Sequence, residues 1–222
     1  MEKLYIFGDS IARGVIFDEL KNRYAFTKNT FANLFAEKTG TIAKTNARFG
    51  CTVTKGVELL QKAELDGYEN VAFEFGGNDC NFDWEAISLA PEGEHLPATP
   101  LQTFYDTYTG MISRCLEKGK RVFLFHLPPI DDEKYFRWIS KDRSAENILK
   151  WLGGSTRFIY TWHESYNCAV ANLANRMNVT LVDIRSVFLQ LRNYRDYLCA
   201  DGIHPNEKGH ALISEVLQAV LV

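Results

Sequence analysis

Short apolar runs in this chain alternate with longer segments whose apolar residues recur at helical spacing. Residues 4–7 form an unbroken run, Leu-Tyr-Ile-Phe, which is typical of a strand buried on both faces of a sheet. Residues 41–46 alternate between apolar and polar instead, which places that strand nearer the edge of the sheet. The strands predicted in this way are residues 4–7, 41–46, 70–75, 121–127 and 178–183.

Helices are predicted between these strands. Thr30 and either Thr52 or Thr54 are suitable N-terminal caps for two of them. The predicted helical segments are residues 31–38, a stretch through 57–63, and residues 101–118, 156–177, 186–193 and 206–222. Strands alternating with helices predict a parallel sheet with helices on both sides. Right-handed crossovers then bring the carboxyl ends of all strands to one edge.

Three segments fall outside this alternation. Residues 11–28 are expected to be loop with some helix, and residues 80–99 a long loop. Residues 131–155 are rich in charge and aromatic side chains and predict a helical insertion over the same end of the sheet. Without repeats or linkers, residues 1–222 are expected to form one domain that carries this insertion.

Composition narrows the range of functions. The chain has 25 Lys and Arg against 28 Asp and Glu, a formal charge of −3, so it lacks the basic surface of a nucleic-acid-binding or polybasic membrane protein. No leader-like segment and no membrane-length apolar run is present, which favours a cytoplasmic protein. The five cysteines have no paired spacing, so free thiols are expected rather than a zinc site or a disulfide framework.

The candidate chemistry begins where the first strand ends, in Gly8-Asp9-Ser10. A serine hydroxyl is a poor nucleophile until a base removes its proton, and histidine can do so near neutral pH. Asp201-Gly202-Ile203-His204 supplies a histidine with an aspartate three residues earlier, a spacing that lets the carboxylate curl back onto the ring. Ser10 is therefore the candidate nucleophile, His204 the base and Asp201 the carboxylate that orients it.

An alkoxide that develops during the reaction needs fixed hydrogen-bond donors. The candidates are the backbone N–H groups of Ser10 and Gly50 and the side-chain amide of Asn78. Asp79 is expected to anchor a turn through nearby backbone N–H groups rather than to act in catalysis.

With these motifs in chain order, the sequence resembles the SGNH/GDSL hydrolase superfamily. The resemblance rests on Gly8-Asp9-Ser10, Gly50, Gly76-Gly77-Asn78-Asp79 and Asp201-x-x-His204, and it covers nearly the whole chain. It implies a three-layer α/β/α sandwich with a five-stranded parallel sheet, a flavodoxin-like fold. It also implies a serine esterase with the triad Ser10, Asp201 and His204, an oxyanion hole of Ser10, Gly50 and Asn78, and no metal or organic cofactor.

The substrate is less constrained. Candidate contacts are Asp9, Trp84 and His126; for His126, a semi-buried histidine with a structural hydrogen bond is the favoured alternative. No role is assigned to His163, nor to His95 and His210. The aromatic, polar insertion favours a short acyl ester, such as acetyl, on a small-molecule or oligosaccharide substrate.

Two alternatives stay open at this point. A lysophospholipase or thioesterase is favoured if the insertion encloses a deep apolar channel. A relative that binds carbohydrate without catalysis is the alternative of another class, although the intact triad argues against it. The sequence leaves the oligomeric state open.

Overall fold

The computed structural model describes residues 2–221 of the chain. Five strands form one parallel sheet in the order β4-β1-β5-β6-β7. Their bounds are Lys3–Gly8 (β1), Ile42–Ala47 (β4), Asn70–Glu74 (β5), Arg121–Phe125 (β6) and Thr180–Val182 (β7). This is the 2-1-3-4-5 strand order of flavodoxin-like sheets, so the fold predicted from the sequence is confirmed.

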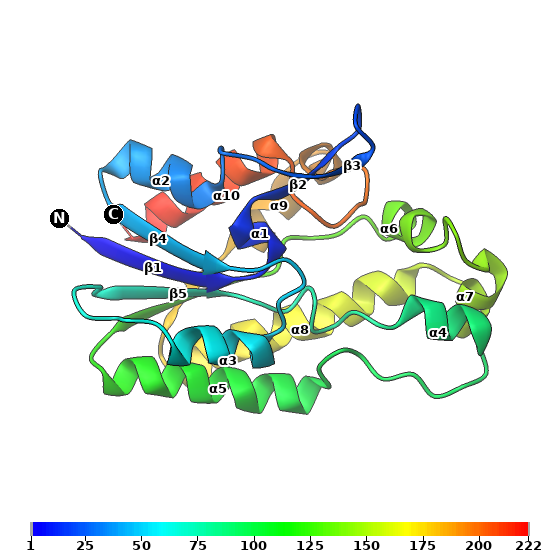
Figure 1. The fold of residues 1–222 in the computed structure, drawn as a ribbon, viewed down its shortest axis with the longest axis horizontal. Helices are drawn as coiled ribbons and strands as arrows, with labels where there is room; N and C mark the ends of the chain where they lie inside the picture. Colours follow the sequence, from blue (N-terminus) through cyan, green and yellow to red (C-terminus); the bar gives the residue numbers. More distant parts are fainter. Residues whose placement is uncertain (1, 222) are drawn as a thin grey trace.

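Helices cover both faces of the sheet (Figure 1). On one face lie α2 (Phe31–Thr39), α9 (Ile184–Gln190) and α10 (Glu207–Leu221), and on the other lie α3 (Val53–Gln61), α5 (Leu101–Glu117) and α8 (Arg157–Arg176). Tyr5 and Phe7 of β1 pack on the side of α3, α5 and α8, whereas Leu4 and Ile6 pack on the side of α2, α9 and α10. Burial of both faces explains why the strand is an unbroken apolar run.

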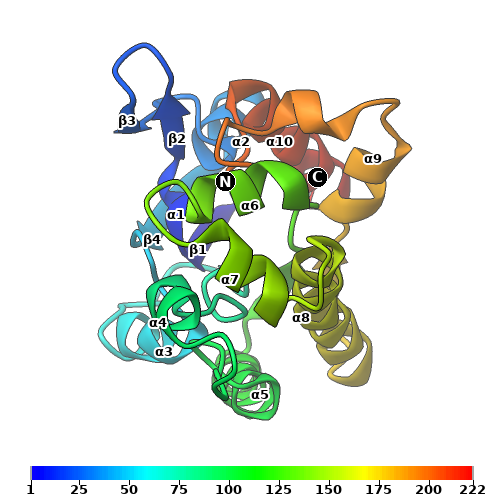
Figure 2. The ribbon, with the colours of Figure 1, turned by 90° about the vertical axis from the view of Figure 1, so that its right-hand side faces the viewer.

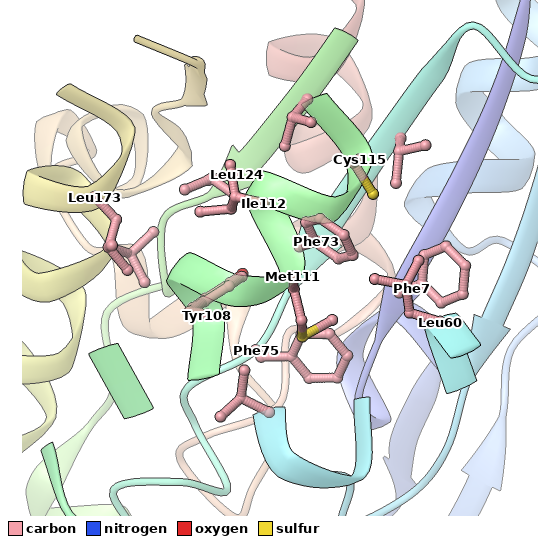
Figure 3. Close-up of a cluster of buried hydrophobic side chains, with 14 of the residues drawn as sticks. Phe7, Leu60, Phe73, Phe75, Tyr108, Met111, Ile112, Cys115, Leu124 and Leu173 are labelled. Carbon is pink, nitrogen blue, oxygen red and sulfur yellow. The ribbon is translucent and has the colours of Figure 1, made fainter. Parts of the chain in front are cut away.

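The core between the sheet and α3, α5 and α8 is built largely from aromatic side chains. Figure 3 shows Phe7 and Phe73, from neighbouring strands, with Tyr108 of α5. Gly56 of α3 lets the helix lie against Phe75, because a Cβ at this position would be only 2.6 Å from Cζ of that ring. This packing holds the carboxyl ends of β1 and β5 in a fixed relation at the strand spacing of about 4.8 Å.

The strand order reverses at β1: the next strand of the sheet along the chain, β4, lies on one side of β1, and the one after it, β5, lies on the other side. Gly8, the last residue of β1, is in register with Ala47 on one side and Glu74 on the other. The three segments that leave these strands therefore start side by side, and they carry Ser10, Gly50 and Asn78. In open parallel sheets, ligands bind outside the carboxyl ends of the strands at such a point.

Short elements gather over this end of the sheet. They are α1 (Ser10–Arg13), β2 (Val15–Asp18), β3 (Arg23–Phe26), α4 (Trp84–Leu89), α6 (Asp132–Ile139), α7 (Ala145–Trp151) and the 3₁₀ helix η1 (Tyr194–Tyr197). Figure 2 looks onto this end and shows α6 and α7 in front of the sheet. The helical prediction for residues 131–155 agrees with these two helices.

Two of the loop predictions need correction. Residues 11–28 form α1 and then an antiparallel hairpin of β2 and β3, and residues 80–99 contain α4. The hairpin escaped prediction because its strands are only four residues long and mostly half-buried or exposed; the apolar run in β2 covers only residues 15–17. Asp83 starts α4 by accepting a hydrogen bond from Ala86 N–H.

The predicted helix caps have mixed outcomes. Thr30 caps α2 as predicted, by accepting a hydrogen bond from Asn33 N–H at 3.1 Å. Thr52 marks the start of α3 but makes no side-chain cap; Asp79 accepts from Val53 N–H in its place. Among residues 2–221, no helix combines the length and apolar character needed to cross a bilayer.

Candidate active site

Ser10 is the first residue of α1, directly after the turn that ends β1. Asp9 holds this turn by accepting a hydrogen bond from Ile11 N–H at 2.8 Å. Position 8 has no room for a side chain, because a Cβ there would be 2.6 Å from Cβ of Ala12. The turn thus places the Ser10 hydroxyl at the carboxyl edge of the sheet, after a strand that is buried at every position but its first.

The loop before α10 brings His204 to Ser10. His204 Nε2 lies 2.9 Å from Ser10 Oγ, and His204 Nδ1 lies 2.6 Å from Asp201 Oδ2. The other carboxylate oxygen, Oδ1, accepts from the backbone N–H groups of Ile203 and His204, both at 3.1 Å. The carboxylate therefore curls back onto the ring as its spacing predicts, and the structure joins the three predicted triad residues in one hydrogen-bonded chain.

Asp201 is fully buried, and its charge is stabilised locally. Burial by itself raises the pKa of Asp201, but the hydrogen bond and charge of His204 and the two backbone N–H groups outweigh it and lower that pKa. Asp201 is thus an ionised partner for an imidazolium at neutral pH. Gly202 is required in this loop, since its φ is +78° and a Cβ would lie 2.7 Å from the carbonyl oxygen of Asp131.

Asn78 follows β5 and is fixed by Asp9. Its Nδ2 donates to Asp9 Oδ2 at 2.8 Å, which uses one N–H of the amide and sets the direction of the other. Asp9 was a candidate substrate contact, but both of its carboxylate oxygens accept hydrogen bonds from the protein's own amides. The geometry gives Asp9 a supporting position under Asn78 and the Ser10 turn.

A second carboxyl group supports Asp9 from below. Glu74 Oε2 accepts from the backbone N–H groups of Asp9 and Ala12, at 3.3 and 3.2 Å. Burial, with the neighbouring charge of Asp9, raises the pKa of Glu74 well above its ordinary value. Burial also raises the pKa of Asp9. Of this buried pair, Glu74 is thus the carboxyl group whose pKa is raised more strongly.

Asp79 anchors the next turn, as expected. Both of its carboxylate oxygens lie within 3.1 Å of Val53 N, at the start of α3. Burial raises the pKa of Asp79 to about 7. Its contacts tie the segment that contains Asn78 to the helix behind it.

Gly50 lies in the turn after β4 with a φ of +67°, a conformation that favours glycine. No described residue accepts a hydrogen bond from its N–H. Gly50 itself is not among the residues that line the main cavity, but its neighbour Phe49 is, and the Phe49 ring stacks 6.2 Å from that of His204. Its predicted part in an oxyanion hole stays a prediction.

A cavity of about 290 Å³ opens beside Ser10 and His204. Its walls come from the Asn78 segment, α4, α6 and the first half of α8, and most of them are apolar or aromatic side chains such as Phe82, Ile139, Ile159 and Trp162. The helical insertion contributes through Tyr135, Trp138 and Ile139 of α6. The insertion is therefore part of the site.

The predicted contacts Trp84 and His126 fall in different places. Trp84 lines the cavity, and its Nε1 donates to Asn81 Oδ1 at 2.8 Å. His126 is not among the lining residues; its Nδ1 bonds Asp183 Oδ1 at 2.6 Å, and its Nε2 is buried without a partner. His126 thus has the structural hydrogen bond of the favoured alternative.

Several site residues were missed by the sequence analysis. Tyr24, on the unpredicted hairpin, lies 5.4 Å from the His204 ring, and its own ring also packs near Phe49 and Trp138. His163 was assigned no role but lines the cavity from α8. Neither residue belongs to a short motif, so only their place in the fold reveals them.

Comparison with solved structures agrees with this architecture. A lipase/acylhydrolase from Enterococcus faecalis is 19% identical, with a TM-score of 0.70 over 99% of this chain and 94% of that chain. An acetyl xylan esterase, AlAXEase, is 17% identical, with a TM-score of 0.68 over 99% of this chain and 100% of that chain. TesA is 17% identical, with a TM-score of 0.65 over 99% and 98%. At these identities the likeness establishes the fold alone.

Among curated proteins, no significant sequence match was found. A family model for the GDSL-like lipase/acylhydrolase family matches residues 6–212, which include every motif discussed above. The chain therefore belongs to the GDSL-like lipase/acylhydrolase family, whose members are serine ester hydrolases.

Proposed function

We propose that this protein hydrolyses a carboxylic ester through an acyl-enzyme on Ser10. The proposal is carried by the continuous hydrogen-bonded chain from Ser10 Oγ through His204 to Asp201. His204 Nε2 takes the hydroxyl proton as Ser10 Oγ bonds to the ester carbonyl carbon. The imidazolium then gives that proton to the alcohol oxygen as its bond to carbon breaks. Water repeats both steps and releases the acid.

The oxyanion of each tetrahedral intermediate needs donors that are already in position. Asn78 is suited to this role, because Asp9 holds one of its N–H groups and leaves the other to point away. The backbone N–H groups of Ser10 and Gly50 complete the proposed set. Asp201 stays ionised and balances the imidazolium.

The acyl group is proposed to occupy the cavity. The alcohol must leave on the side of His204, which protonates it, and the rings beside His204 are open to solvent: Tyr24 is 36% and Phe49 55% exposed. Other walls of the same cavity, formed by Phe82, Trp84 and Ile139, are buried. Its volume of about 290 Å³ is close to the lower end for small-molecule sites, about 300 Å³.

This cavity supports the longer-acyl alternative from the sequence analysis over an acetyl ester. An acetyl group would leave most of the apolar wall uncovered, whereas each further buried CH₂ contributes ~0.8 kcal/mol, or about fourfold in rate or affinity. The substrate proposed here is an ester or thioester of a medium-length acyl group.

An acetyl ester of a carbohydrate is the second candidate. It is supported by the indole rings of Trp84 and Trp138 in the cavity wall, since aromatic faces can stack on sugar rings.

A p-nitrophenyl ester series from acetate through hexanoate and octanoate to dodecanoate separates the two. We expect kcat/KM to rise by about 200-fold from acetate to hexanoate, the gain from four buried CH₂ groups, and to fall once the cavity is full. A maximum at acetate would favour the carbohydrate candidate. Ser10→Ala is the matched control; equal hydrolysis by this variant would instead support a non-catalytic binding protein.

A further inference from the structure

His163 is a polar side chain in an otherwise mainly apolar part of the cavity wall. It is 6% exposed, it lines the cavity from α8, and its Nδ1 is buried without a hydrogen-bond partner. The same helix is held beside the catalytic end of the sheet, because Asn167 Oδ1 accepts from Leu127 N–H and Trp162 Nε1 donates to the carbonyl of Cys80. The imidazole thus lies on a rigid support between β6 and the Cys80 segment.

The protonation of His163 follows from its surroundings. Burial, and then the nearby guanidinium of Arg185, lower the pKa of His163 to about 3, so the ring is neutral at any ordinary pH. A neutral imidazole has one N–H, and an orphaned buried donor costs more than an orphaned acceptor. The proton therefore belongs on Nε2, the nitrogen that is not sealed in the protein, and the buried Nδ1 keeps its lone pair.

Asn81 offers a second donor in the same wall. Its Oδ1 accepts two hydrogen bonds, from Trp84 Nε1 and from the Tyr135 hydroxyl, each at 2.8 Å. This fixes the orientation of the amide and leaves Nδ2 as the group available to a ligand. Asn81 is adjacent to Cys80, whose carbonyl binds Trp162, so the Asn81 amide and the His163 ring belong to segments that touch.

We propose that His163, with Asn81, recognises an uncharged oxygen acceptor, such as an oxo or hydroxyl oxygen, on the group that fills the cavity. The proposal rests on the proposed function and deepens it: the acyl chain is an oxygenated one rather than a plain hydrocarbon. His163 acts as a specificity residue and takes no part in the bond-making steps.

A charged group does not fit this position as well. The guanidinium groups in or near the wall are already paired, Arg143 with Glu85 and Arg185 with Glu164. His163 itself cannot supply a positive charge, because burial keeps it neutral. A carboxylate in the cavity would lack a free cation, whereas a carbonyl or hydroxyl oxygen needs only the two N–H donors.

The test compares p-nitrophenyl octanoate with isomeric oxo-octanoates, in which a ketone carbonyl replaces one CH₂ group at C4 or further along the chain, so that the ketone does not activate the ester carbonyl. In the wild-type enzyme, at least one isomer is expected to exceed the octanoate in kcat/KM by about tenfold, the value of one well-placed hydrogen bond. His163→Leu, which keeps the volume and removes the donor, should reverse this preference. His163→Gln, which restores an N–H donor, should recover part of it.

The outcomes are separable. If wild-type enzyme hydrolyses octanoate through Ser10 but prefers no oxo isomer, the inference on His163 is wrong while the proposed function stands. If Ser10→Ala is as active as wild type on every ester, the proposed function itself fails. A wild-type enzyme that prefers no oxo isomer refutes the inference even if His163→Leu does not fold, and a preference that persists in a folded His163→Leu refutes it as well.

A second measurement does not depend on turnover. In Ser10→Ala labelled with ¹⁵N-histidine, octan-2-one and its positional isomers should shift the Nε2 resonance of His163, and n-octane should not. Equal shifts with the ketones and the alkane would contradict a hydrogen bond at this nitrogen.

Discussion

Two histidines in this molecule make the same contact with an aspartate. His204 with Asp201, and His126 with Asp183, each have Nδ1 2.6 Å from a carboxylate oxygen. The surroundings of the two pairs differ in every other respect. Nε2 of His204 meets the Ser10 hydroxyl beside a cavity, whereas Nε2 of His126 is buried without a partner and away from that cavity.

The aspartates differ as well. Asp201 is fully buried, and its second oxygen accepts two backbone N–H groups of its own loop. Asp183 is partly exposed. Its Oδ1, the oxygen that contacts His126, also accepts a hydrogen bond from Ser186 N–H and so caps α9. A histidine–aspartate contact by itself therefore does not make a catalytic base; the group that Nε2 faces decides its function.

The largest contrast is expected from removing each imidazole. His204→Ala should lower kcat/KM by on the order of 10⁴- to 10⁶-fold, because the Ser10 proton loses its acceptor. His126→Ala should change kcat/KM by less than about threefold and cost about 1 kcal/mol of unfolding free energy. Esterase assays and urea melts of the two variants measure both quantities. A loss of activity in His126→Ala comparable to that in His204→Ala would remove the distinction.

Substituting the two aspartates should show the same contrast in kcat, with a smaller loss of activity than removal of the histidines. Asp201→Asn places either the amide NH₂ group or the amide oxygen, a weaker acceptor than a carboxylate, against His204 Nδ1. We therefore expect kcat to fall by a factor on the order of 10² to 10⁴ while KM changes little. Asp183→Asn keeps a helix cap for α9 and should leave kcat within about threefold. Steady-state kinetics on the preferred ester provides the check; a silent Asp201→Asn would mean that Asp201 does not orient the base.

Glu74 lies beneath the Ser10 turn and supports Asp9, and the His126 pair is not part of this arrangement. Glu74→Gln resembles the protonated acid in shape and should keep kcat within about threefold. Glu74→Ala removes the support and should lower kcat by about 10- to 100-fold through misplacement of Ser10 and Asn78, with KM nearly unchanged. If Glu74→Gln were as impaired as Glu74→Ala, the acid would be acting through its charge instead.

The smallest expected effect concerns how the unfolding free energy depends on pH. Burial raises the pKa of Asp79 to about 7, so the folded protein binds a proton that the unfolded chain releases near pH 4. The contribution of Asp79 to the unfolding free energy should therefore fall as pH rises from about 4 to 7. Burial lowers the pKa of His163 to about 3 and that of His210 to about 4, so these two histidines act with the opposite sign over much of the same window. Asp201, whose pKa is lowered, acts with the opposite sign and only near or below its ordinary value.

Asp79→Asn isolates that contribution. The unfolding free energy of the wild type minus that of Asp79→Asn should fall as pH rises over the same window, measured by urea denaturation of both proteins at several pH values. An unchanged slope in this variant would contradict a raised pKa for Asp79.

The parts of the site that the sequence predicted are those encoded over a few neighbouring residues. The strand Leu4–Phe7, the Gly8-Asp9-Ser10 turn and the Asp201–His204 spacing each carry their own physical signal, and right-handed crossovers bring them together. Residues whose role depends on distant neighbours were not predictable. Nothing local to His126 or His163 tells that one ring meets Asp183 while the other lines a cavity.

The hairpin was missed for a related reason. Phe17 and Tyr24 pack against Trp138 of α6, some hundred residues away in the chain, so the apolar pattern of the hairpin makes sense only in the folded protein. The cavity has the same origin, because α4, α6 and α8 each contribute a few side chains to it. This is why the fold and the proposed triad could be predicted from the sequence, whereas the size of the cavity beside Ser10 could not.

The most direct test of the account is labelling with a fluorophosphonate, followed by peptide mass spectrometry. We expect phosphonylation of Ser10 in the wild-type protein, none in Ser10→Ala, a rate lower by at least about 10³-fold in His204→Ala, and a near-normal rate in His126→Ala. Modification of another residue, or equal labelling of His204→Ala and the wild type, would contradict the claim that His204 activates Ser10.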